Sequence, residues 1–248
     1  MTDSLGYRCK FAVIAPSTNT SVQPEYDDMR PRGVTNHFSR IAIPDTKVTD
    51  EISFMEMMEN IRGATFDATD ISMSMSPDCL IMGMSAETFW DGAEGADRLH
   101  QKMLDRTGGV PVIMGSMALD AAMKAYGGIR KIGILTPYMP VGDDNVRRYF
   151  EDQGYEVVNL VGLKSPSPMM IAHEPAQKLK RAAIEVSEGV DAVIQCGTNL
   201  AFAKVAAMAE FWLEKPVIAI NTATYWHALR SMGIKDQMEG FGALLADH

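Results

Sequence analysis

The sequence lacks a long apolar run and an excess of positive charge. No apolar stretch approaches the roughly 20 residues that a membrane-spanning helix needs. The first 15 residues hold only a short strand-like run, at 11–15, and no signal-peptide pattern. We therefore expect no membrane contact, with the cytoplasm as the default location. The net charge of −9 argues against a general nucleic-acid partner.

Cysteine and the common cofactor motifs are also scarce. The three cysteines, Cys9, Cys79 and Cys196, are too few and too scattered for a disulfide framework, and no C-x-x-C pair is present. The five histidines have no metal-ligand spacing. The sequence also has no phosphate-binding G-x-x-x-x-G-K-[ST], no G-x-G-x-x-G after a strand and no G-x-S-x-G elbow. We expect neither a metal nor a cofactor.

What the sequence does contain is a regular alternation of strand-like and helical patterns. Short apolar runs bounded by polar or glycine residues predict buried parallel strands. They lie at 10–15, 36–43, 78–83, 110–114, 131–136, 156–162, 191–195 and 216–220. Helical patterns lie between them, at about 50–73, 88–106, 116–126, 142–153, 174–187, 199–213 and 222–231. This alternation predicts an α/β fold with parallel sheets and right-handed crossovers.

The second half of the chain echoes the first. The segment K-F-A-V-I-A-P-S-T-N-T at 10–20 resembles R-K-I-G-I-L-T-P-Y-M-P at 130–140. Two further pairs follow in the same order: 77–87 with 190–200, and 110–122 with 215–227. We therefore predict two pseudo-symmetric α/β lobes, one over 1–115 and the other over 116–221.

The repeat indicates where ligands bind. In open parallel sheets they bind beyond the carboxyl ends of the strands. In twin lobes, the ends of the first and third strands of each would face one cleft. The segments there, at 16–21, 83–88, 136–140 and 196–199, are rich in small polar residues and contain no lysine or arginine.

Cys196 is the candidate catalytic residue of this cleft. It follows a buried strand, and a helical pattern starts near Asn199, so we expect the thiol to lie beside free backbone N–H groups at a helix terminus. Neutral donors around it suit a carboxylate and the enediolate formed when the adjacent carbon loses a substituent. The thiol could then supply a proton. The candidate substrate-binding residues are Ser17, Asn19, Gly83, Met84, Ser85, Tyr138, Gly197, Thr198 and Asn199.

These segments resemble a known superfamily. P-S-T-N-T at 16–20, T-P-Y at 136–138 and C-G-T-N-L at 196–200 are similar to maleate cis–trans isomerases. M-G-M-S at 82–85 resembles the corresponding loop of arylmalonate decarboxylase, and both enzymes belong to the aspartate/glutamate racemase superfamily. The resemblance implies a cofactor-independent enzyme with two flavodoxin-like lobes. It also implies a C-terminal helix, within 222–248, that packs back on the first lobe.

One position departs from the family pattern. Most members carry a cysteine at each of two pseudo-symmetric strand ends, but here Gly83 stands at the first and only Cys196 is present. Arylmalonate decarboxylase shares this arrangement. By analogy, Cys196 protonates one face of the carbanion, and the amides and hydroxyls of Met84, Ser85, Tyr138 and Gly197 hold the retained carboxylate. We expect Gly83 to leave room for the departing carboxylate or a bulky substituent. Ser17 and Asn19 suggest a second carboxylate site.

Three functions remain open from the sequence. The first is decarboxylation of a small substituted dicarboxylate. The second is a maleate isomerase-like or racemase-like reaction, in which Glu87 or His227 replaces the missing thiol. The third is a non-catalytic carboxylate-binding protein. The resemblance leaves a homo-oligomer open, and the proline-rich segment at 164–173 is a candidate lid.

Overall fold

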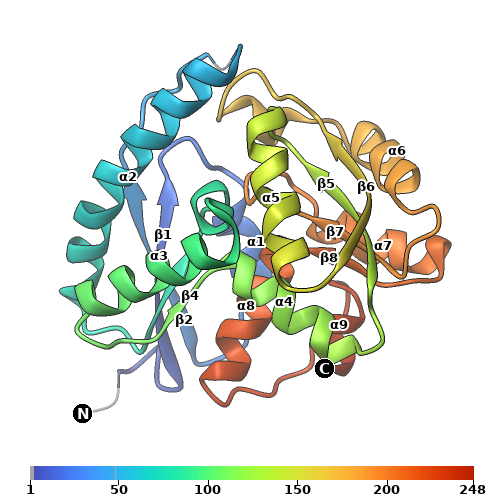
Figure 1. The fold of residues 1–248 in the computed structure, drawn as a ribbon. Helices are drawn as coiled ribbons and strands as arrows, with labels where there is room; N and C mark the ends of the chain where they lie inside the picture. Colours follow the sequence, from blue (N-terminus) through green and yellow to red (C-terminus); the bar gives the residue numbers. More distant parts are fainter. Residues whose placement is uncertain (1–2, 48) are drawn as a thin grey trace.

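Two four-stranded parallel sheets form the two halves of the molecule (Figure 1). The structure is a computed structural model that describes residues 3–47 and 49–248. The strand order is β2-β1-β3-β4 in the first sheet and β6-β5-β7-β8 in the second. The same order in both halves confirms the prediction of two pseudo-symmetric α/β lobes.

The first half of the chain follows the predicted alternation and adds two short helices, at 22–28 and 86–89, that the sequence did not reveal. All its strands except the edge strand at 34–41 are fully or largely buried, which explains why they read as apolar runs. Its elements are β1 (Cys9–Pro16), α1 (Val22–Asp28), β2 (Val34–Ile41), α2 (Glu51–Met73), β3 (Cys79–Met82), the 3-10 helix η1 (Ala86–Phe89), α3 (Gly92–Arg106), β4 (Val112–Ile113) and α4 (Gly115–Tyr126).

The second lobe repeats this order and ends in two helices. Its elements are β5 (Lys131–Thr136), α5 (Pro140–Asp152), β6 (Glu156–Gly162), the 3-10 helix η2 (Met170–His173), α6 (Ala176–Val186), β7 (Ala192–Gln195), α7 (Ala203–Leu213), β8 (Val217–Ala219), α8 (Ile220–Ser231) and α9 (Ala243–Asp247). Of these, α9 and η2 were not predicted, and η2 lies in the candidate lid at 164–173.

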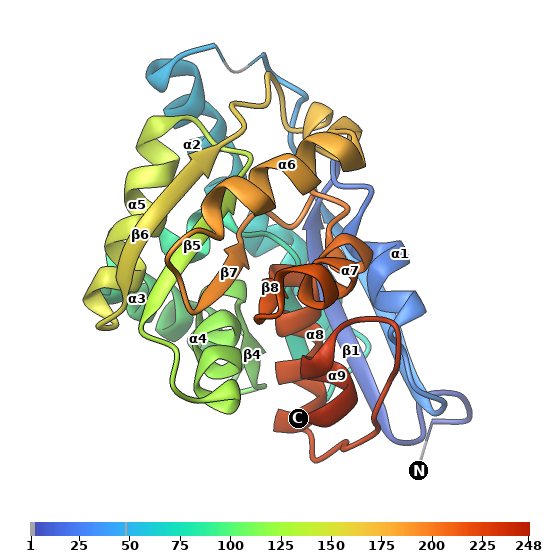
Figure 2. The same ribbon diagram turned by 90° about the vertical axis from the view of Figure 1, so that its right-hand side faces the viewer.

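Helices from both lobes meet along the seam. α8 packs against α4 and also against α1, β3 and β4 of the first lobe. Figure 2 shows α8 beside the first sheet, with α9 next to it. On the other side of the seam, α3 packs against α5. The division of the chain at 115 and 221 stays a prediction.

Two predicted helices begin later than the sequence pattern indicated. The helix expected over 88–106 is interrupted because Asp91 and Gly92 adopt left-handed conformations, with φ of 60° and 70°. The helix expected from Asn199 begins only at Ala203. Residues 197–200 form a tight turn instead, in which the Leu200 N–H donates to Gly197 O at 3.1 Å. Cys196 is therefore not at a helix N-terminus.

Candidate active site

A small pocket lies between the lobes at the carboxyl ends of the strands. Its cavity volume is about 80 Å³, and a bound water takes roughly 10–15 Å³ of such volume, so the space suits a small organic acid. The loops after β1, β3, β5 and β7 all contribute to its wall, as the internal echo predicted. The segment at 165–171, which lies within the candidate lid, also lines it, although movement of this segment stays a prediction. The sequence did not reveal that α2 contributes to the wall as well.

A cluster of neutral donors joins the two lobes at this pocket. The Tyr138 hydroxyl donates to Ser85 Oγ at 2.6 Å, and the Thr198 N–H donates to the same oxygen at 3.1 Å. A hydroxyl offers two lone pairs and one hydrogen. Both acceptor positions of Ser85 are used, so its own hydrogen is what it can offer to a ligand. All three residues line the pocket, and this geometry suits an oxyanion.

The two asparagines line the same pocket but are held by the protein. Asn19 Oδ1 accepts from the N–H groups of Ser21 and Val22, both at 3.0 Å, and its Nδ2 donates to Thr198 Oγ1 at 3.2 Å. Asn199 Oδ1 accepts from the Thr20 N–H at 2.9 Å, while Nδ2 donates to Pro168 O at 2.9 Å. Both side chains therefore fix the loops across the seam. Their role as ligand donors stays a prediction.

Ser17 and Gly83 do not line the pocket. Ser17 is exposed, and its hydroxyl donates to Ile43 O at 3.0 Å and accepts from the Ile43 N–H at 3.1 Å. A Cβ on Gly83 would lie 3.1–3.2 Å from Ile14 O and from methyl groups of Val13 and Val22. The space beside Gly83 is therefore filled by the first lobe, and the expectation that it leaves room for a substituent is wrong.

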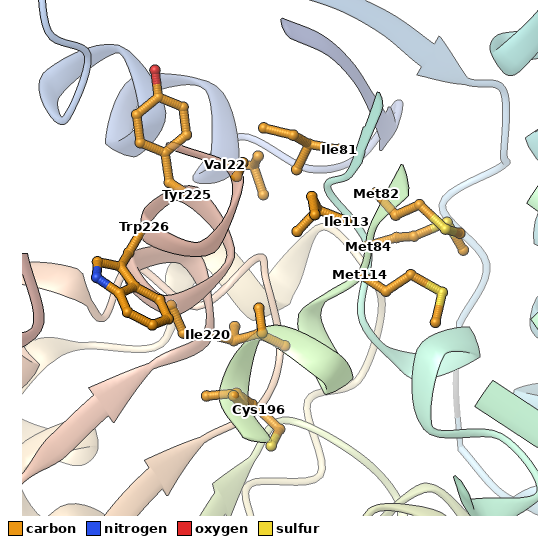
Figure 3. Packing of buried hydrophobic residues seen from close by; sticks show 14 of the residues in the cluster. Val22, Ile81, Met82, Met84, Ile113, Met114, Cys196, Ile220, Tyr225 and Trp226 are labelled. Atoms are coloured by element: carbon orange, nitrogen blue, oxygen red, sulfur yellow. The ribbon is translucent and has the colours of Figure 1, made fainter. Parts of the chain in front are cut away.

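Cys196 is fully buried at the end of β7 and does not itself line the pocket. In Figure 3 it lies near Ile220, with its sulfur directed away from that side chain. Its neighbours Gly197 and Thr198, together with Tyr138, form the adjacent pocket wall. Burial raises the pKa of the Cys196 thiol well above its ordinary value, and the Asp143 carboxylate adds to this shift. The thiol is therefore protonated at neutral pH, as a proton donor must be.

Most of the remaining wall is apolar. No lysine or arginine lines the pocket in the part of the chain that the structure describes. Met84, predicted as a substrate-binding residue, belongs to this wall, and Figure 3 shows it beside Met82 and Met114. The apolar side chains are Ile43, Met57, Ile61, Met84, Met139 and Ile171.

Two acidic side chains lie at or near the site. Glu87 lines the pocket, and its Oε1 accepts from Arg62 Nε at 2.9 Å. Burial raises the pKa of Glu87, although Arg62 opposes this shift. Asp143 is buried on α5, near Cys196, and no local sequence signal singled it out. His227 does not line the pocket, and burial lowers its pKa.

The described residues form neither a metal cluster nor a membrane-spanning helix. Across residues 3–47 and 49–248, no group of three or more histidine, cysteine, aspartate or glutamate side chains is placed to hold a metal ion. Within the same residues, none of the helices combines the length and the apolar character needed to cross a bilayer.

Comparison with known proteins identifies the family. The model of the arylmalonate decarboxylase family matches residues 12–245. A maleate isomerase from Pseudomonas putida is 28% identical over 246 residues, which cover 94% of this chain and 95% of that protein. A maleate cis–trans isomerase structure from Nocardia farcinica, a cysteine-to-serine variant with a covalently bound succinylcysteine intermediate, has a TM-score of 0.86 at 20% identity. The match covers 97% of this chain and 99% of that one.

A liganded double variant of arylmalonate decarboxylase has a TM-score of 0.81 at 17% identity, with 97% of this chain and 100% of that one covered. The structural matches confirm the two-lobed fold, and the family match spans nearly the whole sequence. The resemblance inferred from the strand-end motifs is thus confirmed, and the chain belongs to the arylmalonate decarboxylase family.

Proposed function

We propose that this protein is a cofactor-independent decarboxylase of small substituted dicarboxylates, in which Cys196 protonates the carbanion left by loss of carbon dioxide. Family membership makes it an enzyme of the isomerase and lyase type. One observation carries the choice of reaction: only one of the three cysteines lies at the pocket end of a sheet. Cys9 and Cys79 begin their strands, and β3 is four residues long, so Cys79 lies roughly 13 Å from the pocket end.

A single thiol suits decarboxylation. Racemisation needs an acid and a base on opposite faces of the substrate, whereas loss of carbon dioxide itself generates the carbanion. One proton donor then completes the reaction. The fully buried and protonated Cys196 has the required protonation state.

The pocket wall supports the same reaction. The Ser85 hydroxyl, whose oxygen is held by the Tyr138 hydroxyl and the Thr198 N–H, offers its hydrogen to one carboxylate and to the enediolate that forms from it. A second carboxylate would lie against the apolar wall, where a charge without a partner is costly. Its departure as neutral carbon dioxide removes that cost.

A maleate isomerase-like reaction is the second candidate. It is favoured by the 28% identical maleate isomerase and by the succinylcysteine intermediate in a structural neighbour. In this reaction Cys196 would keep its role as proton donor. Glu87, which lines the pocket, is the candidate for the second acid–base group.

Incubation in heavy water separates the two reactions. Phenylmalonate, as a representative arylmalonate, and maleate serve as probes, with Cys196→Ser as the control. Carbon dioxide release from phenylmalonate with one deuteron in the product supports decarboxylation. Conversion of maleate to its trans isomer without carbon dioxide supports isomerisation. If wild-type protein acts on phenylmalonate no faster than Cys196→Ser does, the decarboxylase proposal is wrong.

A further inference from the structure

A buried carboxyl group lies over three neighbouring strand ends of the second sheet. Thr136, the last residue of β5, pairs in register with Gly162 of β6. The Thr136 hydroxyl donates to Asp143 Oδ1, and a Cβ on Gly162 would lie only 2.1 Å from Asp143 Oδ2. The carboxyl group therefore occupies the space above Gly162, which explains why that position has no side chain.

Strand register places Cys196 on the same face. Leu135 pairs with Gln195, and the Cys196 N–H donates to Leu135 O at 2.8 Å, so the parallel ladder continues to the next pair, Thr136 and Cys196. Paired residues of adjacent parallel strands point to the same side of the sheet and lie about 4.8 Å apart. The thiol and the carboxyl group of Asp143 are thus neighbours on the face covered by α5.

The surroundings allow this carboxyl group to carry a proton at neutral pH. Asp143 is only 8% exposed, and burial raises its pKa to about 7. Asp144 raises the pKa further, whereas Lys164 and Arg147 lower it, as does the hydrogen bond from Thr136. The charge of Asp143 also acts on the pKa of Cys196 and on that of Tyr138, which places the carboxyl group close to both.

A buried proton donor needs a group inside the protein that returns its proton after each turnover. Cys196 is fully buried, so a thiolate formed there cannot take a proton directly from bulk water. We propose that Asp143 is this supply: after Cys196 has protonated the substrate carbon, the Asp143 carboxyl group returns a proton to the sulfur. Asp143 acts through Cys196 and touches no substrate. The inference rests on the proposed role of Cys196 as proton donor.

The step balances without a redox change. The C–C bond to the departing carboxylate breaks and releases carbon dioxide, and its electron pair stays on the carbon. The Cys196 S–H bond breaks as the C–H bond of the product forms. The thiolate then takes the proton of Asp143, and the resulting carboxylate takes one from water. Each turnover therefore consumes one proton from solvent.

The test does not require turnover. Infrared spectroscopy follows the exchange of the Cys196 S–H for S–D after transfer to heavy water, and the band is identified by its absence in Cys196→Ser. We expect Asp143→Asn to slow this exchange by about 10²-fold, the lower end of what a positioned acid or base contributes. Asp152→Asn is the matched control, because Asp152 is an exposed carboxylate at the far end of the same helix, and it should leave exchange unchanged.

A second measurement uses the unmodified protein. If Asp143 supplies the proton, the logarithm of the exchange rate should bend near pH 7, where this group titrates. Exchange in a folded Asp143→Asn variant at the wild-type rate, or a pH profile with no bend, would overturn the inference.

Burst kinetics with excess phenylmalonate separate the proton supply by Asp143 from the proposed decarboxylase function. Asp143→Asn should release about one equivalent of carbon dioxide at the wild-type rate and then slow down, because the first proton is already on the sulfur. A merely structural role would slow both phases equally and would contradict the inference. Slow exchange without activity on phenylmalonate would instead leave the proton route standing and refute the proposed reaction.

Discussion

Ser85→Ala tests the donor cluster most directly. The substitution removes the hydroxyl that receives the Tyr138 O–H at 2.6 Å and the Thr198 N–H at 3.1 Å and offers its own hydrogen to the pocket. Loss of one donor aimed at a developing oxyanion typically lowers kcat by about 10²–10³-fold, or about 2.7–4 kcal/mol. We expect an effect in this range, with a smaller change in KM, because the charge on the enediolate exceeds that on the bound substrate at this position.

The same substitution should also affect stability. The Thr198 N–H that now donates to Ser85 is buried, and an unsatisfied buried donor costs about 1–3 kcal/mol. The free energy of unfolding should therefore fall by about that amount, as measured by urea denaturation. Ser17→Ala is the matched control, because Ser17 is exposed and lies outside the pocket lining, so its kcat should stay at the wild-type value.

Steady-state kinetics on phenylmalonate provide the assay. A kcat for folded Ser85→Ala within about threefold of wild type would refute the assignment of this cluster as the oxyanion site, since one such donor is worth far more. A rise in KM alone would show that Ser85 binds substrate and transition state equally well.

Variants at three other positions, Cys196, Gly83 and Glu25, test other parts of the structure. Cys196→Ser should fold and lose about 10²–10⁴-fold in kcat, and near-normal kcat would remove Cys196 from the mechanism. Gly83→Cys should lower the free energy of unfolding by about 1–3 kcal/mol in urea denaturation, because its Cβ would lie 3.1–3.2 Å from Ile14 O and from methyl groups of Val13 and Val22. It should add no deuterium exchange, and exchange on the second face of the product would show that this position does reach the substrate. Burial raises the pKa of Glu25 from 4.5 to about 7, so the folded state holds this proton more tightly than the unfolded state. Protonation of Glu25 therefore contributes fully to the free energy of unfolding below pH 4.5. This contribution, about 1–3 kcal/mol, is lost as the pH rises to about 7. Glu25→Gln should flatten this slope in urea titrations, and an unchanged slope would contradict the assignment.

The sequence predicted the central strands of both sheets well because they are buried on both faces. Segments such as 131–136 and 191–195 contain few polar residues, and the structure places strands at Lys131–Thr136 and Ala192–Gln195. The loops at the carboxyl ends of β1, β3, β5 and β7 line one pocket, as expected from parallel topology.

What the sequence could not predict depends on contacts between distant segments. The start of α7 was misplaced because Asn199 bonds across the seam to Thr20 and within its own lobe to Pro168, and these partners outweigh its local helical pattern. Asp143 gave no signal because its importance arises from strand register. Only the pairing of Thr136 with Gly162 and the adjoining Cys196 places that carboxyl group beside the sulfur.

The hydrogen bonds across the seam have a mechanical consequence. Asn19 bonds to Thr198, Ser21 Oγ donates to Asn199 O at 2.9 Å, and Asn221 bonds both to Thr198 O at 2.9 Å and to Glu25 of the first lobe. The loops that line the pocket therefore also hold the two lobes together. Any movement that brings a molecule into contact with the buried Cys196 sulfur must strain or break some of these hydrogen bonds. Entry of the substrate and separation of the two lobes are therefore one coupled event.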